Sequence, residues 1–282
     1  METCRVKEIF KGVIRLRGWD PETSTVAAGE RALVAELVSE RLRLGYEFDW
    51  WPELMWTEQR RYEADYAADT TYADGDVVWY DDQYWESQED ANLGNTPADD
   101  SAYWAAPGDD WVRLLQYRMS GQREIGAVDV NYCLFEVDPR TNPYAAPVQG
   151  VKLHYDGIIA PSWAPAEPWV YWRRPAPEVS WTDWAAGTTY AIGDLCYLES
   201  TGKCYRANAA TTGQSPATYT DVWVEVAVPK FLKRYVVHGA YADRLLEREE
   251  RYKEEDLAEK SLEELAERMM DQRVDRRARF GR

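Results

Sequence analysis

The apolar positions near the two ends of the chain follow a helical period. In the first part, apolar residues recur at helical spacing over residues 6–16, and Asp20-Pro21 then interrupts the pattern with turn chemistry. Ser24 or Thr25 is placed to cap a second helix, which we expect to run to about Tyr46. These residues therefore predict a pair of helices at the N-terminus.

The C-terminal part has the same period but a different balance of charge. Apolar residues recur at helical spacing over residues 231–246, after Pro229, which suits the first turn of a helix. From 248 to 268 the sequence is heavily charged, and its thin apolar stripe predicts a helix that is mostly solvated or pairs along one seam. The stripe comprises Leu257, Leu262, Leu265, Ala266 and Met269.

Between these ends, apolar and polar residues alternate over short segments, which is the period of β-strands. The segments are residues 124–137, 151–155 and 169–173, and proline-rich joints separate them. Because proline is confined to the edges and turns of sheets, we expect a β layer of short strands with many edges.

One segment of the middle part occurs twice, as a unit of roughly 40 residues. Residues 66–79 and 184–197 share an aromatic residue, a Thr-Thr-Tyr run, a Gly-Asp pair and a final aromatic residue. In the first copy, residues 76–80 and 83–86 predict two strands joined by a turn at Asp81-Asp82. Further correspondences are Tyr84 with Tyr205, Gly94 with Gly213, Pro97 with Pro216, and Trp104 with Trp223.

These patterns predict an α+β protein with five segments. The N-terminal helical part of the core spans residues 1–62, module 1 spans 63–110, and the β layer spans 111–180. Module 2 spans 181–227, and the C-terminal helices with a basic tail span 228–282. The helical core thus combines the N-terminal helix pair with the long C-terminal helix, and the two small β modules are insertions.

Charge is distributed unevenly along this acidic chain. The 282 residues carry a formal net charge of −17, which disfavours general nucleic-acid binding because phosphate contacts need Lys and Arg. Residues 66–104 hold ten Asp and Glu with no Lys or Arg, whereas 184–223 hold three acids and two bases. The last ten residues, 273–282, hold five Arg and one Asp, so we expect them to be extended unless an acidic partner surface orders them.

The four cysteines form no pair with the spacing of a zinc site. Two of them flank a predicted hairpin turn, so a cross-strand disulfide is one alternative and free thiols in a reducing compartment are the favoured one. The sequence has no secretory h-region and no apolar run long enough to span a bilayer, so we expect a cytoplasmic protein or one assembled there into something larger. The cysteines are Cys4, Cys133, Cys196 and Cys204, of which Cys196 and Cys204 flank the turn.

The inventory of reactive residues predicts a protein that is not an enzyme and uses no cofactor. The two histidines, His154 and His238, belong to no catalytic motif, and the sequence has no phosphate-binding loop or nucleophile elbow. We interpret the carboxylate pairs as solvated turn residues: Asp81-Asp82, Asp99-Asp100 and Asp109-Asp110. A calcium site at Asp74, Asp76, Asp81 or Asp82 is an alternative that no EF-hand-like spacing supports.

The repeated pattern resembles the small chitin- and cellulose-binding modules attached to bacterial chitinases. It reads aromatic-x5-Tyr-x2-Gly-Asp-x-apolar, then Tyr, Gly-x2-Pro and Trp. In that family, exposed aromatic residues after the second strand's Tyr stack on sugar rings, but the matching residues 86–92 and 206–212 contain no aromatic residue. The resemblance implies an alternative function, a polysaccharide-binding surface protein, with Tyr84, Trp85 and Tyr205 as its candidate sugar-stacking residues.

The rest of the chain resembles the head–tail connector (adaptor) proteins of tailed bacteriophages, some of which carry such modules as inserts. The resemblance implies a structural virion protein that forms a ring, commonly of twelve copies, below the portal. Such a ring extends the DNA channel and gives the tail a platform. The residues that carry this resemblance to connector proteins are Phe48-Asp-Trp-Trp-Pro-Glu-Leu54, Ile125-Gly-Ala-Val128, Asp138-Pro-Arg-Thr-Asn-Pro143, Asp156-Gly-Ile158, Trp169-Val-Tyr-Trp-Arg-Arg-Pro175 and the helix around 235–246.

This connector resemblance also implies partners and contact residues. The partners are other copies of the chain, the portal protein, a tail-side neck or tail terminator protein, and genomic DNA that passes without sequence recognition; no membrane is involved. The location is the virion neck, after assembly in the host cytoplasm, with both modules facing outward. Portal docking is assigned to Arg273, Arg276, Arg277, Arg279, Phe280 and Arg282, and contact with a neighbouring subunit or the portal to Leu257, Leu262, Leu265 and Met269.

Overall fold

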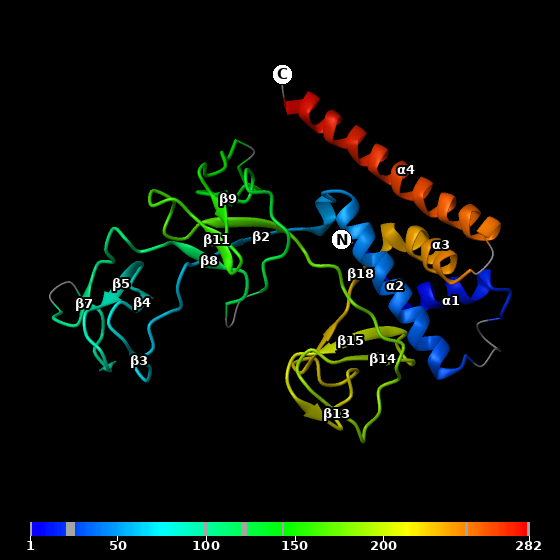
Figure 1. Ribbon diagram of the computed structural model, residues 1–282, viewed down its shortest axis with the longest axis horizontal. Helices are drawn as coiled ribbons and strands as arrows, with labels where there is room; N and C mark the ends of the chain where they lie inside the picture. The colour runs from blue at the N-terminus through cyan, green and yellow to red at the C-terminus, as the bar shows by residue number, and fades with distance from the viewer. Residues whose placement is uncertain are drawn as a thin grey trace. The chain divides into compact units, whose positions relative to one another are not determined.

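The computed structural model describes residues 2–20, 26–98, 101–119, 123–142, 144–245 and 248–280, with side chains of the last helix described over 249–268. It has the expected α+β class, with helices and many short antiparallel strands. The chain divides into two compact units (Figure 1). Unit 1 contains Met1–Glu53 and Pro175–Arg282, and unit 2 contains Leu54–Arg174.

Unit 1 brings the helices from both ends of the chain together. The N-terminal pair is α1 (Val6–Leu16) and α2 (Ala28–Phe48), and the C-terminal pair is α3 (Lys233–Arg244) and α4 (Arg248–Phe280). The short antiparallel pair β1 (Thr3–Cys4) and β18 (Val228–Pro229) places the start of the chain beside the start of α3. The predicted helix pair is therefore confirmed, although α2 begins after Ala27, which makes no side-chain capping bond; Ser24 and Thr25 lie outside the described residues.

Glycines and one buried ion pair set the close packing of these helices. A Cβ atom added at Gly45 of α2 would lie 3.1 Å from the ring of Tyr235, so the α2 backbone approaches α3 directly. Arg41 of α2 is only 7 % exposed, and its guanidinium donates from Nε and Nη2 to the Asp243 carboxylate of α3 at 2.6 and 2.5 Å. His238 on α3 lies 2.7 Å from a carboxylate oxygen of Glu254 on α4, so α3 is joined to both neighbours.

Module 2 also belongs to unit 1, where it packs on α1. Phe10 of α1 stacks on Trp181 with ring centroids 4.3 Å apart, and its edge contacts Tyr197. The backbone N–H of Lys7 donates to Gly202 O at 3.0 Å. The strands of the module are β13 (Thr189–Tyr190), β14 (Leu195–Leu198), β15 (Lys203–Ala207), β16 (Thr211–Thr212) and β17 (Trp223–Glu225), in the orders β13-β16 and β14-β15-β17.

Unit 2 contains module 1 and the β layer. The module strands are β3 (Thr71–Tyr72), β4 (Val77–Tyr80), β5 (Gln83–Ser87), β6 (Asn92–Leu93) and β7 (Trp104–Ala105). The layer consists of two sheets, β2-β12-β9 and β10-β11-β8. Their strands are β2 (Met55–Gln59), β8 (Leu114–Gln116), β9 (Leu134–Phe135), β10 (Lys152–Leu153), β11 (Gly157–Ile159) and β12 (Trp169–Arg173).

The β layer has less strand than its alternating pattern predicts. The strand expected at residues 169–173 is confirmed as β12, but within 124–137 only β9 is a strand. Asp129 turns the chain there, because its side chain accepts from Asn131 N at 3.0 Å and its carbonyl accepts from Tyr132 N at 2.9 Å. The expected layer of short strands is present, but most of residues 124–137 is turn rather than strand, since local turn bonds replace ladder bonds.

The two modules share one hydrogen-bond network, which confirms the repeat as structural. Asp76 and Asp194 each accept from a backbone N–H three residues earlier, both at 2.7 Å. The Nε1 groups of Trp104 and Trp223 each donate to the carbonyl nine residues earlier, at 2.7 and 2.9 Å. In module 1 the predicted turn at Asp81-Asp82 is also confirmed, with φ angles of 48° and 61° that suit a tight hairpin.

Candidate functional site

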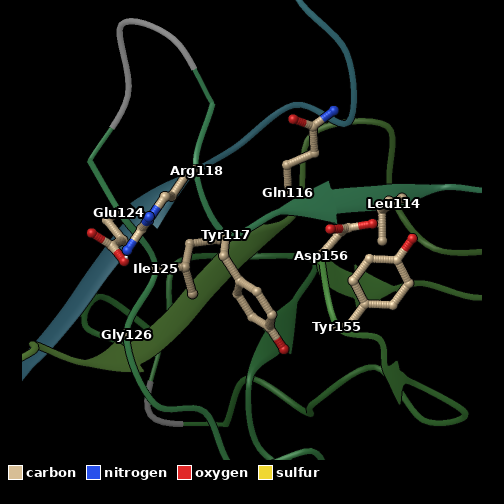
Figure 2. Close-up of a pocket in the computed structure, with 9 residues that line it drawn as sticks. All are labelled: Leu114, Gln116, Tyr117, Arg118, Glu124, Ile125, Gly126, Tyr155 and Asp156. Atoms are coloured by element: carbon tan, nitrogen blue, oxygen red, sulfur yellow. Dashed lines mark hydrogen bonds and ion pairs between the residues drawn. The ribbon is translucent and has the colours of Figure 1, made fainter.

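A cavity in unit 2 opens beside the sheet β10-β11-β8 (Figure 2). Its volume is about 640 Å³, within the range of roughly 300–1,000 Å³ typical of small-molecule sites. Residues from three separate segments line it: Leu114, Gln116, Tyr117, Arg118, Glu124, Ile125, Gly126, Tyr155 and Asp156. We call this cavity the two-tyrosine pocket.

A tight hairpin turn between β10 and β11 fixes one wall of the two-tyrosine pocket. His154 N donates to Gly157 O at 2.9 Å, which closes the turn around Tyr155 and Asp156. Gly157 is required there, because a Cβ atom at that position would lie 2.1 Å from Leu115 O of β8. The turn therefore holds the Tyr155 ring, which is 84 % exposed, at the pocket's edge.

The strand β8 and the segment after it form the opposite wall. Tyr117 N donates to Asp156 O at 2.9 Å, and Ile125 N donates to Tyr117 O at 2.8 Å, so the three segments are bonded in series. Ile125 is 4 % exposed and belongs to the core of unit 2. Arg118 donates from Nε to Glu124 Oε1 at 2.9 Å, and Figure 2 shows this pair at one end of the pocket, away from Tyr155.

Both phenols in the pocket remain protonated near neutral pH. Burial raises the pKa of Tyr117, and the carboxylate of Asp156, which accepts a hydrogen bond from Tyr155, raises the pKa of that phenol. The pocket thus presents two neutral rings with O–H groups beside an amide, two carboxylates and a guanidinium. Such groups can bind a ligand by ring stacking and directional hydrogen bonds.

No protein-family model, curated protein or solved structure matches this chain. The two-tyrosine pocket is therefore interpreted from its own chemistry. Over the described ranges, no group of three or more His, Cys, Asp or Glu side chains is arranged to hold a metal ion. None of the described helices combines the length and apolar character needed to cross a bilayer.

The three candidate sugar-stacking rings of the modules are buried, which corrects their assignment. Tyr84, Trp85 and Tyr205 are 7 %, 4 % and 8 % exposed. The Tyr84 hydroxyl donates to Ala166 O at 2.8 Å, so this ring attaches module 1 to the β layer. Buried rings present no face to a sugar, and the structure leaves these three residues a packing role.

The apolar stripe of α4 is partly used inside the chain. Leu262 is 3 % exposed, on the same face as Glu254 and Glu255, which contact His238 and Arg41 at 2.7 and 3.6 Å. The expectation that Leu262 faces another protein was therefore wrong, because this face of α4 is already buried within the chain, with α3 packed against α4. Leu257 and Leu265 are half-buried, and the side chain of Met269 lies outside the described residues.

The basic end of the chain differs from its expected conformation. The backbone of α4 continues to Phe280, so the prediction of an extended segment was wrong up to that residue. Earlier in α4, the pair Asp256–Lys260 at 2.6 Å has the four-residue spacing that supports a helix. The docking assignment is untested: the side chains of Arg273, Arg276, Arg277, Arg279 and Phe280, and all of Arg282, lie outside the described residues.

The cysteines are free thiols, as the favoured alternative predicted. In the β14-β15 register, Cys196 pairs with Tyr205 and Cys204 with Tyr197, so the two cysteines do not face each other. Burial raises the pKa of Cys196 to about 12 and that of Cys204 to about 11. These thiols are therefore unreactive packing groups.

Sequence reasoning missed the two-tyrosine pocket. One available signal was Asp156-Gly157 between two short apolar segments, a pattern typical of a hairpin turn that projects its side chains. No local signal places Gln116 or Tyr117 beside this turn, because the sheet brings them there from about forty residues away.

Proposed function

We propose that this protein is a structural, non-enzymatic head–tail adaptor of a tailed bacteriophage, assembled as a ring below the portal. The observation that carries the proposal is the closure of unit 1. The N-terminal helix pair and the C-terminal helices pack as one body, although the β layer and both modules separate them in the sequence. This closure supports the proposal, because the expected adaptor has a helical core made of the N-terminal helix pair and the C-terminal helices.

The length of α4 supports a role in contacts between subunits. With 33 residues it extends over about 50 Å, whereas the 12 residues of α3 cover about 18 Å. We propose that the part of α4 that follows the buried Leu262 contacts a neighbouring copy or the portal. In the proposed ring, the half-buried Leu257 and Leu265 are the described leucines of the apolar stripe that remain for such a contact.

The charge of the protein supports the proposed relation to DNA. A net charge of −17 disfavours adhesion of phosphates, so DNA can pass a ring of such subunits without being held. The basic residues 273–282 have the opposite charge to the rest of the chain, and their Arg side chains suit an acidic groove on the portal. A tail-side neck or tail terminator protein would bind the opposite end of the ring.

Electron microscopy of purified virions with this protein labelled tests the proposal. We expect the label in a ring at the vertex below the portal, in the virion neck. Label distributed over the capsid or the tail fibres would refute the adaptor role. The polysaccharide-binding alternative at the modules has lost its support, because its three candidate rings are buried.

A further inference from the structure

We propose that the two-tyrosine pocket of unit 2 binds a neutral saccharide. This inference goes beyond the adaptor role and does not depend on it. It also differs from the module-based alternative, because the pocket lies in the β layer and shares no residue with the candidate rings of the modules.

The exposed ring of Tyr155 is the first observation. An aromatic ring that is 84 % exposed contributes little to folding, yet the turn that carries it is tightly specified by Gly157 and by the bond from His154. The imidazole of His154 packs against the ring with centroids 4.1 Å apart. A stacking platform held in place in this way loses little conformational entropy when a ligand binds.

The polar groups around the ring are the second observation. Figure 2 shows the carboxylate of Asp156 beside the ring of Tyr155. The carboxylate of Asp156 and the amide of Gln116 can each bond two adjacent hydroxyl groups. Sugar rings offer such a combination, with apolar C–H faces for stacking and hydroxyl groups around the rim.

The charge of the pocket favours a neutral ligand. The only cation among the lining residues is Arg118, and Glu124 neutralises it at 2.9 Å. Asp156 then leaves the pocket with a negative charge, which disfavours phosphates and nucleic acids. The volume of about 640 Å³ and its open form suit a short oligosaccharide.

Isothermal titration calorimetry of the full-length protein with cellotetraose and with tetra-N-acetylchitotetraose, both neutral, tests the proposal. We expect binding of at least one of them and a loss of affinity of about tenfold or more in Tyr155→Ala. Tyr144→Ala is the matched control, since this ring is also 84 % exposed but does not line the pocket. Gln116→Ala should weaken binding about fivefold through loss of a hydrogen bond.

Three results would overturn the proposal. The first is that neither tetrasaccharide binds at millimolar concentration. The second is that Tyr155→Ala and Tyr144→Ala bind equally well, which would indicate non-specific association. The third is that Tyr155→Ala leaves binding unchanged but prevents ring assembly, because the pocket would then be a protein contact. Far-ultraviolet circular dichroism checks that each variant is folded.

Discussion

Arg41 and Asp243 form an ion pair, and removing Asp243 should reduce the free energy of unfolding more than removing Arg41. The Arg41 side chain is 8 % exposed and that of Asp243 is 20 % exposed. Removing one partner of a buried pair costs roughly 3–5 kcal/mol, because the other charge is left without compensation. Asp243→Ala leaves the more buried charge, and Glu255 at 3.6 Å compensates it only in part, so we expect a loss of about 2–4 kcal/mol.

The reverse substitution, Arg41→Met, should cost less. Methionine keeps most of the apolar stem that packs near Gly239, where an added Cβ would lie 2.7 Å from Arg41 Cδ. The Asp243 carboxylate that remains can be hydrated, so we expect a loss of about 1–2 kcal/mol. The double variant Arg41→Met with Asp243→Leu should recover much of the stability, because it leaves no buried charge.

Urea unfolding followed by circular dichroism at 222 nm measures these differences. The signal reports unit 1, because α1, α2, α3 and α4 all belong to it. Arg43→Met is a suitable control, since Arg43 lies on the same helix but its side chain is 50 % exposed. An Arg41→Met variant that is less stable than Asp243→Ala would refute the reasoning about which charge is left buried.

Three further predictions concern other parts of the chain. Deleting residues 273–282 should weaken binding to the portal at least tenfold in a pull-down titration while the melting temperature stays unchanged; equal affinity would refute the docking assignment. Burial raises the pKa of Glu63 to about 7, so the folded state holds a proton that the unfolded state releases above about pH 4.5. Stability should therefore fall as pH rises from about 4.5 to 7, and Glu63→Gln should flatten this slope in urea titrations at each pH. Gly157→Ala should destabilise unit 2 by about 3 kcal/mol, because the added Cβ atom would collide with Leu115 O. Unfolding followed by tryptophan fluorescence measures the loss. Gly187→Ala is the control and should be neutral, because a Cβ atom added there has no neighbour within 4 Å.

Local patterns predicted the parts of the fold that local forces decide. The helical period of residues 6–16 gave α1, and the pair Asp81-Asp82 gave the turn of module 1, because each depends on neighbours in the sequence. The apolar stripe did not reveal that α4 continues to Phe280, because the stripe ends at Met269 and the last ten residues hold five Arg.

Features that depend on distant contacts were not predictable from the sequence. Tyr84 has the same sequence surroundings whether it is exposed or buried, and its burial follows from Tyr62, Trp111 and Ala166. The two-tyrosine pocket likewise exists only because the β8-β11 register places Gly157 opposite Gln116. Side-chain pattern decides which segment forms a strand, but the pairing of strands decides which side chains share a cavity.

The pairing of β1 with β18 delays the folding of unit 1 until most of the chain has been synthesised. Cys4 pairs with Val228, and these residues are 228 − 4 = 224 positions apart. At about 5–20 residues per second, a ribosome needs roughly 11–45 s to make the segment between them. Unit 2 is continuous in the sequence, so it can fold during that interval, whereas α1 and α2 must wait for α3, which packs against both of them. The helical body is thus the last part of the chain to be completed, so any contact that uses its helices forms only after the whole chain has been made.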